Sequence, residues 1–101
     1  MTDDAGGSVY RLESGRVYRI GRDNGAEIYL ADARVSWAHA VIRAEGPVWV
    51  LQDLSSRNGT FLEGGERISR AEITGPCALR FGHPQDGPLL RFEPADAPES
   101  P

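Results

Sequence analysis

The chain has almost no cysteine and no long apolar run. Of its 101 residues, one is a cysteine, Cys77, and two are histidines. A lone cysteine cannot form an intrachain disulfide or a cysteine-based metal site, so stability has to come from apolar burial. No stretch approaches the roughly 20 apolar residues of a membrane helix. The acidic start, Met1–Gly7, lacks the basic and then apolar pattern of a secretory signal. We therefore expect a cytoplasmic protein with no direct membrane insertion.

Positive charge is also in short supply. The chain has 11 Lys and Arg residues against 15 Asp and Glu residues, a formal net charge of -4 and a pI near 5.1. Proteins that coat nucleic acid depend on summed positive potential, so we expect no nucleic-acid partner. An anion site in such a chain has to be built from a few placed residues instead of a general positive field.

What the chain does have is a series of short, strand-like segments. With 40% hydrophobic and 26% charged residues, its composition and length are those of one globular domain. β-Branched and aromatic residues alternate with Gly, Pro, Asn and Asp, and this pattern predicts a β-sandwich or barrel. The expected strands are 9–13, 16–21, 27–30, 38–45, 48–53, 60–62, 72–73, 77–81 and 89–93.

Turn signals and polar loops separate these segments. Hairpin-type turns are predicted at Ser14-Gly15, at Glu45-Gly46-Pro47 and at Asn58-Gly59. Three loops carry more polar groups than a turn requires, namely residues 22–26, 31–37 and 54–59. Because the loops of a sandwich cluster at its two ends, alternate connections can meet at one rim and form a site.

Composition also predicts the bounds of the domain. Residues 1–7 are expected to form a flexible N-terminus, residues 8–93 the sandwich, and residues 94–101 a flexible tail or the start of a linker, because neither end has an apolar pattern.

Three short motifs supply the donors that an anion of phosphate geometry needs. An arginine offers a planar fork for two oxygens, a serine adds a hydroxyl, and an asparagine can both donate to and accept from an extended peptide backbone. The motifs are Gly21-Arg22, Ser36-x-x-His39 and Ser55-Ser56-Arg57-Asn58-Gly59-Thr60. Each alone is ordinary: Gly-Arg-Asp reads as a solvated turn and Asn-Gly as a hairpin turn, so the indication comes from their combination.

In this order, and with the segments 27–30 and 49–54 between them, the motifs resemble those of a forkhead-associated (FHA) domain. The resemblance runs from about the second strand to Phe81-Gly82. It implies a two-sheet β-sandwich of about eleven short, mostly antiparallel strands with the binding loops at one end. It also implies binding of phosphothreonine.

The resemblance further implies roles for individual residues. Arg22 and Ser36 would contact the phosphate, and Asn58 the peptide backbone beside it. Arg57 would add a contact, and Arg34 could read the residue three places after the phosphothreonine. The supporting residues would be His39, which holds the Ser36 loop, and Gly21, Gly59 and Thr60.

Two positions depart from the family pattern. Trp37 stands where Arg, Asn or Lys is common, which leaves only its backbone N–H for the phosphate. Its side chain could lie in the core, contact the peptide or anchor a protein interface. Glu63 stands where Asn is common, and we expect its carboxylate near the peptide groove. Trp49, within an apolar run, is expected in the core.

Enzyme chemistry finds no support in the residues. Ser36 and His39 are not accompanied by a Gly-x-Ser-x-Gly elbow. One cysteine and two histidines provide neither a Cys–His pair nor a zinc site. Gly64-Gly65 lacks the Lys and Ser or Thr of a phosphate loop. We therefore expect no catalytic residue, no metal and no cofactor.

The sequence thus predicts phosphothreonine-dependent protein–protein recognition in Ser/Thr kinase signalling. The expected partner is a phosphothreonine-containing protein or peptide, in trans or in the same polypeptide, with a Ser/Thr protein kinase upstream. The alternative is a phosphate-independent interaction or oligomerisation module on the same scaffold, anchored by Trp37.

Overall fold

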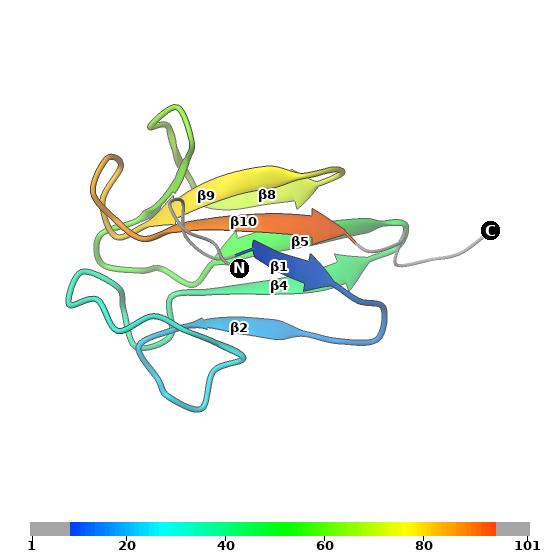
Figure 1. Cartoon of the computed structure of the whole chain (residues 1–101), viewed down its shortest axis with the longest axis horizontal. Coiled ribbons are helices and arrows are strands. Elements are labelled where there is room, and N and C mark those ends of the chain that lie inside the picture. The colour runs from blue at the N-terminus through cyan, green and yellow to red at the C-terminus, as the bar shows by residue number, and fades with distance from the viewer. Residues whose placement is uncertain (1–8, 95–101) are drawn as a thin grey trace.

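The structure is a computed structural model that describes residues 9–94 (Figure 1). Two five-stranded sheets form a β-sandwich, and none of the described residues lies in a helix. One sheet has the order β1 (Val9–Leu12), β10 (Leu89–Pro94), β9 (Cys77–Phe81), β6 (Thr60–Leu62), β7 (Arg67–Ile68). The other has the order β3 (Ile28–Tyr29), β2 (Tyr18–Gly21), β4 (Ala40–Glu45), β5 (Val48–Asp53), β8 (Arg70–Ile73).

This architecture confirms the predicted two-sheet sandwich. Strand pairing is antiparallel except for β1 with β10 and β2 with β3. All nine predicted strands occur, with ends that differ by up to two residues, and the described residues form ten strands in place of about eleven. The strand that the sequence did not reveal is β7, whose two residues become a strand only by pairing with β6. Apart from Pro94, which ends β10, the predicted flexible termini lie outside the described residues.

Two of the three predicted hairpins are wrong. Glu45-Gly46-Pro47 does join the antiparallel pair β4 and β5, with Glu45 opposite Val48. Ser14-Gly15 and Asn58-Gly59 instead connect strands of different sheets, because β1 pairs with β10 and β6 pairs with β7 and β9. Turn residues reverse the chain, but burial of the strand faces on either side decides which sheet the next strand joins.

The core lies between the two sheets and follows the alternation of the strands. Trp49 and Leu51 of β5 and Phe81 of β9 are at most 1% exposed, as is Phe92 of β10. Trp49 therefore packs in the core, as predicted. Because β2, β3 and β5 run in the same direction, the loops that follow them gather at one end of the sandwich, and the turns β1–β2 and β4–β5 lie at the other (Figure 1).

The core predicts a large stability loss on truncation of Phe92. Phe92→Ala removes a fully buried ring and should lower the free energy of unfolding by about 3–5 kcal/mol, measured by urea denaturation with Trp49 as the fluorescent reporter. Val17→Ala, at a position 52% exposed, is the control and should change it by less than about 0.5 kcal/mol. An equal, small effect of both variants would contradict this description of the core.

Candidate functional site

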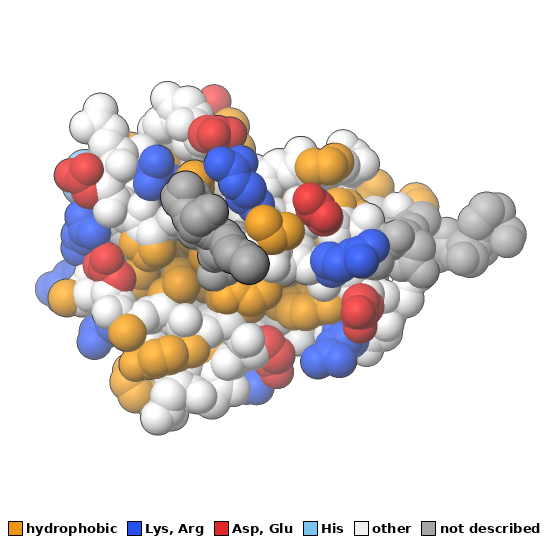
Figure 2. Space-filling model, in the orientation of Figure 1, with side chains coloured by type: hydrophobic (Ala, Val, Ile, Leu, Met, Phe, Trp, Pro, Cys, Tyr) orange, Lys and Arg blue, Asp and Glu red, His pale blue; other side chains and the backbone are white. Residues whose placement is uncertain are grey.

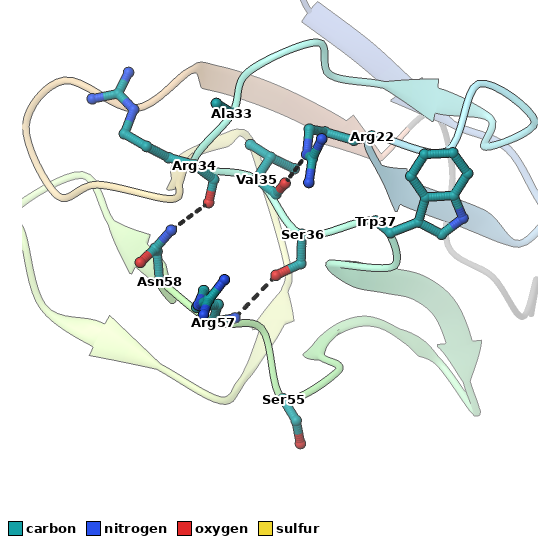
Figure 3. A pocket seen from close by; sticks show the side chains of 9 residues that line it. All are labelled: Arg22, Ala33, Arg34, Val35, Ser36, Trp37, Ser55, Arg57 and Asn58. Carbon is teal, nitrogen blue, oxygen red and sulfur yellow. Dashed lines mark hydrogen bonds between the residues drawn. The ribbon is translucent and has the colours of Figure 1, made fainter.

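The motif residues meet in a hollow at the loop end of the sandwich. Its volume is about 320 Å³. Every residue predicted to contact the phosphopeptide lines it, and so does Arg34 (Figure 3). The full lining is Arg22, Ala33, Arg34, Val35, Ser36, Trp37, Ser55, Arg57 and Asn58. The segments 21–27, 30–39 and 54–59, far apart in the sequence, therefore form one surface.

Arg22 presents part of its guanidinium to the hollow. Its backbone N–H donates to the Ser36 carbonyl at 3.1 Å, and its Nε donates to the Val35 carbonyl at 2.5 Å (Figure 3). Neither Nη1 nor Nη2 has a hydrogen-bond partner within residues 9–94. The side chain is thus held by one nitrogen, while the two terminal nitrogens remain available for the oxygens of an anion.

Ser36 adds an oriented hydroxyl. Its Oγ accepts the backbone N–H of Arg57 at 3.0 Å, which leaves the hydroxyl hydrogen free to donate (Figure 3). The next residue, Trp37, has a backbone N–H without a partner in the described part of the chain. Arg57 itself is exposed, and its guanidinium is not paired with any carboxylate of residues 9–94.

His39 lies behind this surface and connects two loops. Its ring is fully buried, its Nδ1 accepts the Ser36 N–H at 3.0 Å, and its Nε2 lies 3.0 Å from the Gly59 carbonyl oxygen. Because a backbone N–H can only donate and a carbonyl can only accept, the proton must sit on Nε2. Burial lowers the pKa of His39, since the charged ring would be desolvated. The neutral ring therefore ties the Ser36 loop to the loop that carries Asn58.

Asn58 and Arg34 form the opposite side of the hollow from Trp37. The Asn58 Nδ2 donates to the Arg34 carbonyl at 2.9 Å, so its Oδ1 and second Nδ2 hydrogen stay free for a peptide backbone (Figure 3). The Arg34 guanidinium binds both carboxylate oxygens of Asp32, at 3.0 and 2.9 Å, and lowers the pKa of Asp32 to about 2. Arg34 thus adds little net charge, while Arg22 and Arg57 remain unneutralised.

The predicted supporting glycines stand where a side chain would clash. A Cβ at Gly21 would lie 2.1 Å from the Trp37 carbonyl oxygen. Gly59 has φ +98°, and a Cβ there would lie 2.7 Å from the Arg67 Nε. Thr60 is fully buried, and its Oγ1 has no hydrogen-bond partner in the described structure.

The sequence did not predict that Asp53 and Ser56 brace the Asn58 loop. The Asp53 carboxylate accepts the Ser56 N–H at 3.1 Å and the Ser56 Oγ–H at 2.8 Å. The Ser56 Oγ in turn accepts the Gly59 N–H at 3.0 Å. The spacing Asp53-x-x-Ser56 is a known loop-stabilising pattern and could have identified them. Ser55, between them, lies in the predicted motif 55–60 and lines the hollow with φ 58°, but the sequence assigned it no role of its own.

Trp37 and Glu63, the two residues that depart from the family pattern, both lie at the surface in places that the structure defines. The Trp37 side chain is 61% exposed, so it does not belong to the core. Glu63 does not line the hollow, because β6 carries the chain away from Asn58. Glu63 lines a separate hollow with Cys77, Arg91 and Glu93.

The electrostatics of the site differ from those of the whole chain. No acidic residue lines the hollow, although the net charge is -4. Figure 2 shows blue Arg atoms at the left edge of the molecule, the end that carries the loops in Figure 1. Within residues 9–94, no group of three His, Cys, Asp or Glu residues could hold a metal, and no helix could cross a membrane. The arrangement is suited to binding an anion.

Comparisons with known proteins agree with this geometry. The sequence model of the FHA domain matches residues 18–82. The FHA domain-containing protein FhaA of Mycobacterium tuberculosis is 36% identical over 81 residues, which is 80% of this chain and 15% of FhaA. The chain therefore spans a small part of that relative.

Solved structures show the same sandwich. The FHA-1 domain of Rv1747 from Mycobacterium tuberculosis has a TM-score of 0.75 and 33% identity over 81% of this chain and 82% of that one. A domain solved in an analysis of phosphothreonine-dependent FHA domain interactions has a TM-score of 0.65 and 31% identity, and the match covers 80% and 79% of the two chains.

The position of His39 predicts a pH-dependent stability. Its pKa is lowered in the folded state, so below about pH 6.5 the unfolded chain gains a proton that the folded chain does not. The free energy of unfolding should therefore fall as the pH drops from about 7 to 5, above the range in which Asp32 titrates. Urea denaturation at a series of pH values measures this.

His83→Gln, which changes the other histidine, is the matched control and should keep the pH dependence, whereas His39→Gln should lose it. NMR titration of the wild-type His39 ring tests the same point if His39→Gln does not fold. A His39 ring that titrates at or above its ordinary pKa would contradict the account.

Proposed function

The chain belongs to the forkhead-associated (FHA) domain family, and on this premise we propose that its loop hollow binds a phosphothreonine of a partner protein. Domains of this family are protein-interaction modules. The proposed role is phosphorylation-dependent recognition in Ser/Thr kinase signalling, without catalysis. The partner would be a phosphoprotein, in trans or in the same polypeptide. The similarity to a domain from a study of phosphothreonine-dependent FHA interactions supports this proposal.

The observation that carries the proposal is the set of unpaired donors in one hollow. Two terminal nitrogens of Arg22 and the Ser36 hydroxyl line it, and no carboxylate competes for them there. A phosphothreonine carries about -1.5 to -2 charges at neutral pH, and each charge-assisted hydrogen bond contributes about 1.5–3 kcal/mol. An unmodified threonine would leave these donors without matching acceptors, so binding should depend on phosphorylation.

Each residue then has a proposed task. Arg22, Ser36 and the Trp37 backbone N–H hold the phosphate oxygens, and Arg57 adds a second positive charge. Asn58 holds the peptide backbone through its free Oδ1 and Nδ2 hydrogen. Among the supporting residues are His39, Gly21, Gly59 and Thr60.

Arg34 is proposed to contact the peptide through one directed hydrogen bond more than through its charge. Asp32 and the Asp86 carbonyl occupy its Nε and Nη2, which leaves Nη1 for a peptide group. Because Asp32 neutralises its charge, this donor should distinguish only weakly between a polar or carbonyl acceptor and a strongly acidic side chain.

Arg22 gives the sharpest test of the proposal. Arg22→Ala should weaken binding of a phosphothreonine peptide, selected from a library by the wild type, by about 2–5 kcal/mol, because truncation leaves the dianion without its charged partner. Isothermal calorimetry measures the change. Arg91→Ala is the matched control, because it removes the same charge from an exposed position on β10, outside the hollow, and should leave the affinity nearly unchanged.

The same assay distinguishes the alternative function. If the unphosphorylated peptide binds as tightly as the phosphorylated one, and Arg22→Ala has no effect while the fold is intact, the hollow is not a phosphate site. The phosphate-independent module anchored by Trp37 would then account for binding.

A further inference from the structure

A second hollow lies beside the first and shares Trp37 with it. Its volume is about 160 Å³, and its walls are apolar apart from Arg19 and Asp23. The apolar lining residues are Ile20, Ala26, Trp37, Ala38, Ala40 and Leu54. The hollow is therefore formed by β2, the start of β4 and residues of all three loops that make the proposed phosphate site.

Of the two charged groups in this hollow, Arg19 is paired with Glu27, and Asp23 has one carboxylate oxygen hydrogen-bonded to the backbone. The Arg19 guanidinium donates to both carboxylate oxygens of Glu27, at 2.9 and 3.0 Å. The Asp23 Oδ1 accepts the Gly25 N–H at 2.9 Å. A ligand group that enters the hollow thus meets mainly apolar surface, which favours an uncharged, apolar group.

Two large apolar side chains of the hollow are held on the surface by fixed backbone. Trp37 is 61% and Leu54 is 42% exposed. The Trp37 carbonyl accepts the Asp23 N–H at 3.2 Å, and the Leu54 N–H donates to the His39 carbonyl at 2.9 Å. Figure 3 shows the indole directed away from the side of the first hollow where Asn58 and Arg34 lie. The backbone thus fixes where the indole begins, and the exposed ring can cover an apolar group bound beside it.

We propose that the second hollow binds an apolar or aromatic side chain of the same phosphopeptide, a few residues from the phosphothreonine on the side away from Asn58. This assignment rests on the proposed function of the first hollow. The second hollow is smaller than the roughly 300–1,000 Å³ of a small-molecule site, which suits one side chain. An extended peptide advances about 3.3 Å per residue, so a short segment spans two hollows that share a residue. Trp37 and Leu54 are then specificity-determining residues.

A scanned peptide library tests the assignment. Phosphothreonine peptides carry Leu, Phe, Gly or Ser at each flanking position in turn, and fluorescence polarisation gives the affinities. At one position the wild type should bind Leu or Phe about tenfold more tightly than Gly, as expected for burial of an apolar side chain. Leu54→Ser should bring this ratio close to one while binding the Gly peptides like the wild type.

Trp37→Ala gives a second, independent variant and should also lose the apolar preference. Val17→Ser, exposed and outside both hollows, is the control and should keep it. Tryptophan fluorescence adds a direct signal: Leu and Phe peptides should shift the emission of the wild type to the blue, and this shift should be absent in Trp37→Ala, in which Trp49 is the remaining tryptophan.

Two results would overturn the assignment. One is an apolar preference that is absent from the wild type or unchanged in both variants, while binding still depends on phosphate; the proposed phosphate site would then stand alone. The other is a dimer in analytical ultracentrifugation that Trp37→Ala and Leu54→Ser abolish, which would assign the hollow to a second copy of the chain. Binding that ignores phosphate altogether would instead reject the proposed function.

Discussion

The bridge that His39 makes between Ser36 and Gly59 is the constraint on which the site depends. It joins a loop that leads into β4 with a loop that leads into β6, and these strands belong to different sheets. Its ring is itself held against Phe81 of the core, with ring centroids 5.5 Å apart. The position of the Ser36 hydroxyl relative to Asn58 is therefore set by the packing of the sandwich and not by either loop alone.

The site also shows how an acidic chain can bind an anion. The positive charge of the hollow comes from Arg22 and Arg57, because Asp32 neutralises Arg34. Few donors with fixed directions give selectivity for the geometry of a phosphate, whereas a general positive field would attract any polyanion. The apolar hollow next to Trp37 would add selectivity for the residues around the phosphate.

Sequence reasoning succeeded where the signal is local or carried by a motif. Strands such as Val48–Asp53 are defined by β-branched and aromatic residues between turns, and the motif residues Arg22, Ser36 and Asn58 were predicted to line one site, where the structure brings them together. What failed depends on distant partners. The strand β7 exists only through β6, and the turn at residues 14–15 could not reveal that it crosses between sheets.

The exposure of Trp37 and the pairing of Arg34 with Asp32 likewise depend on tertiary packing. The central claim is that three loops form one phosphate-binding surface, and NMR shift mapping tests it most directly. A phosphothreonine peptide added to the ¹⁵N-labelled chain should shift the Arg22 side-chain Nε–H and the backbone N–H of Ser36, Trp37 and Asn58 together, and its unphosphorylated form should not. Shifts clustered instead near Glu63 and Arg91, or identical shifts with both peptides, would contradict the claim.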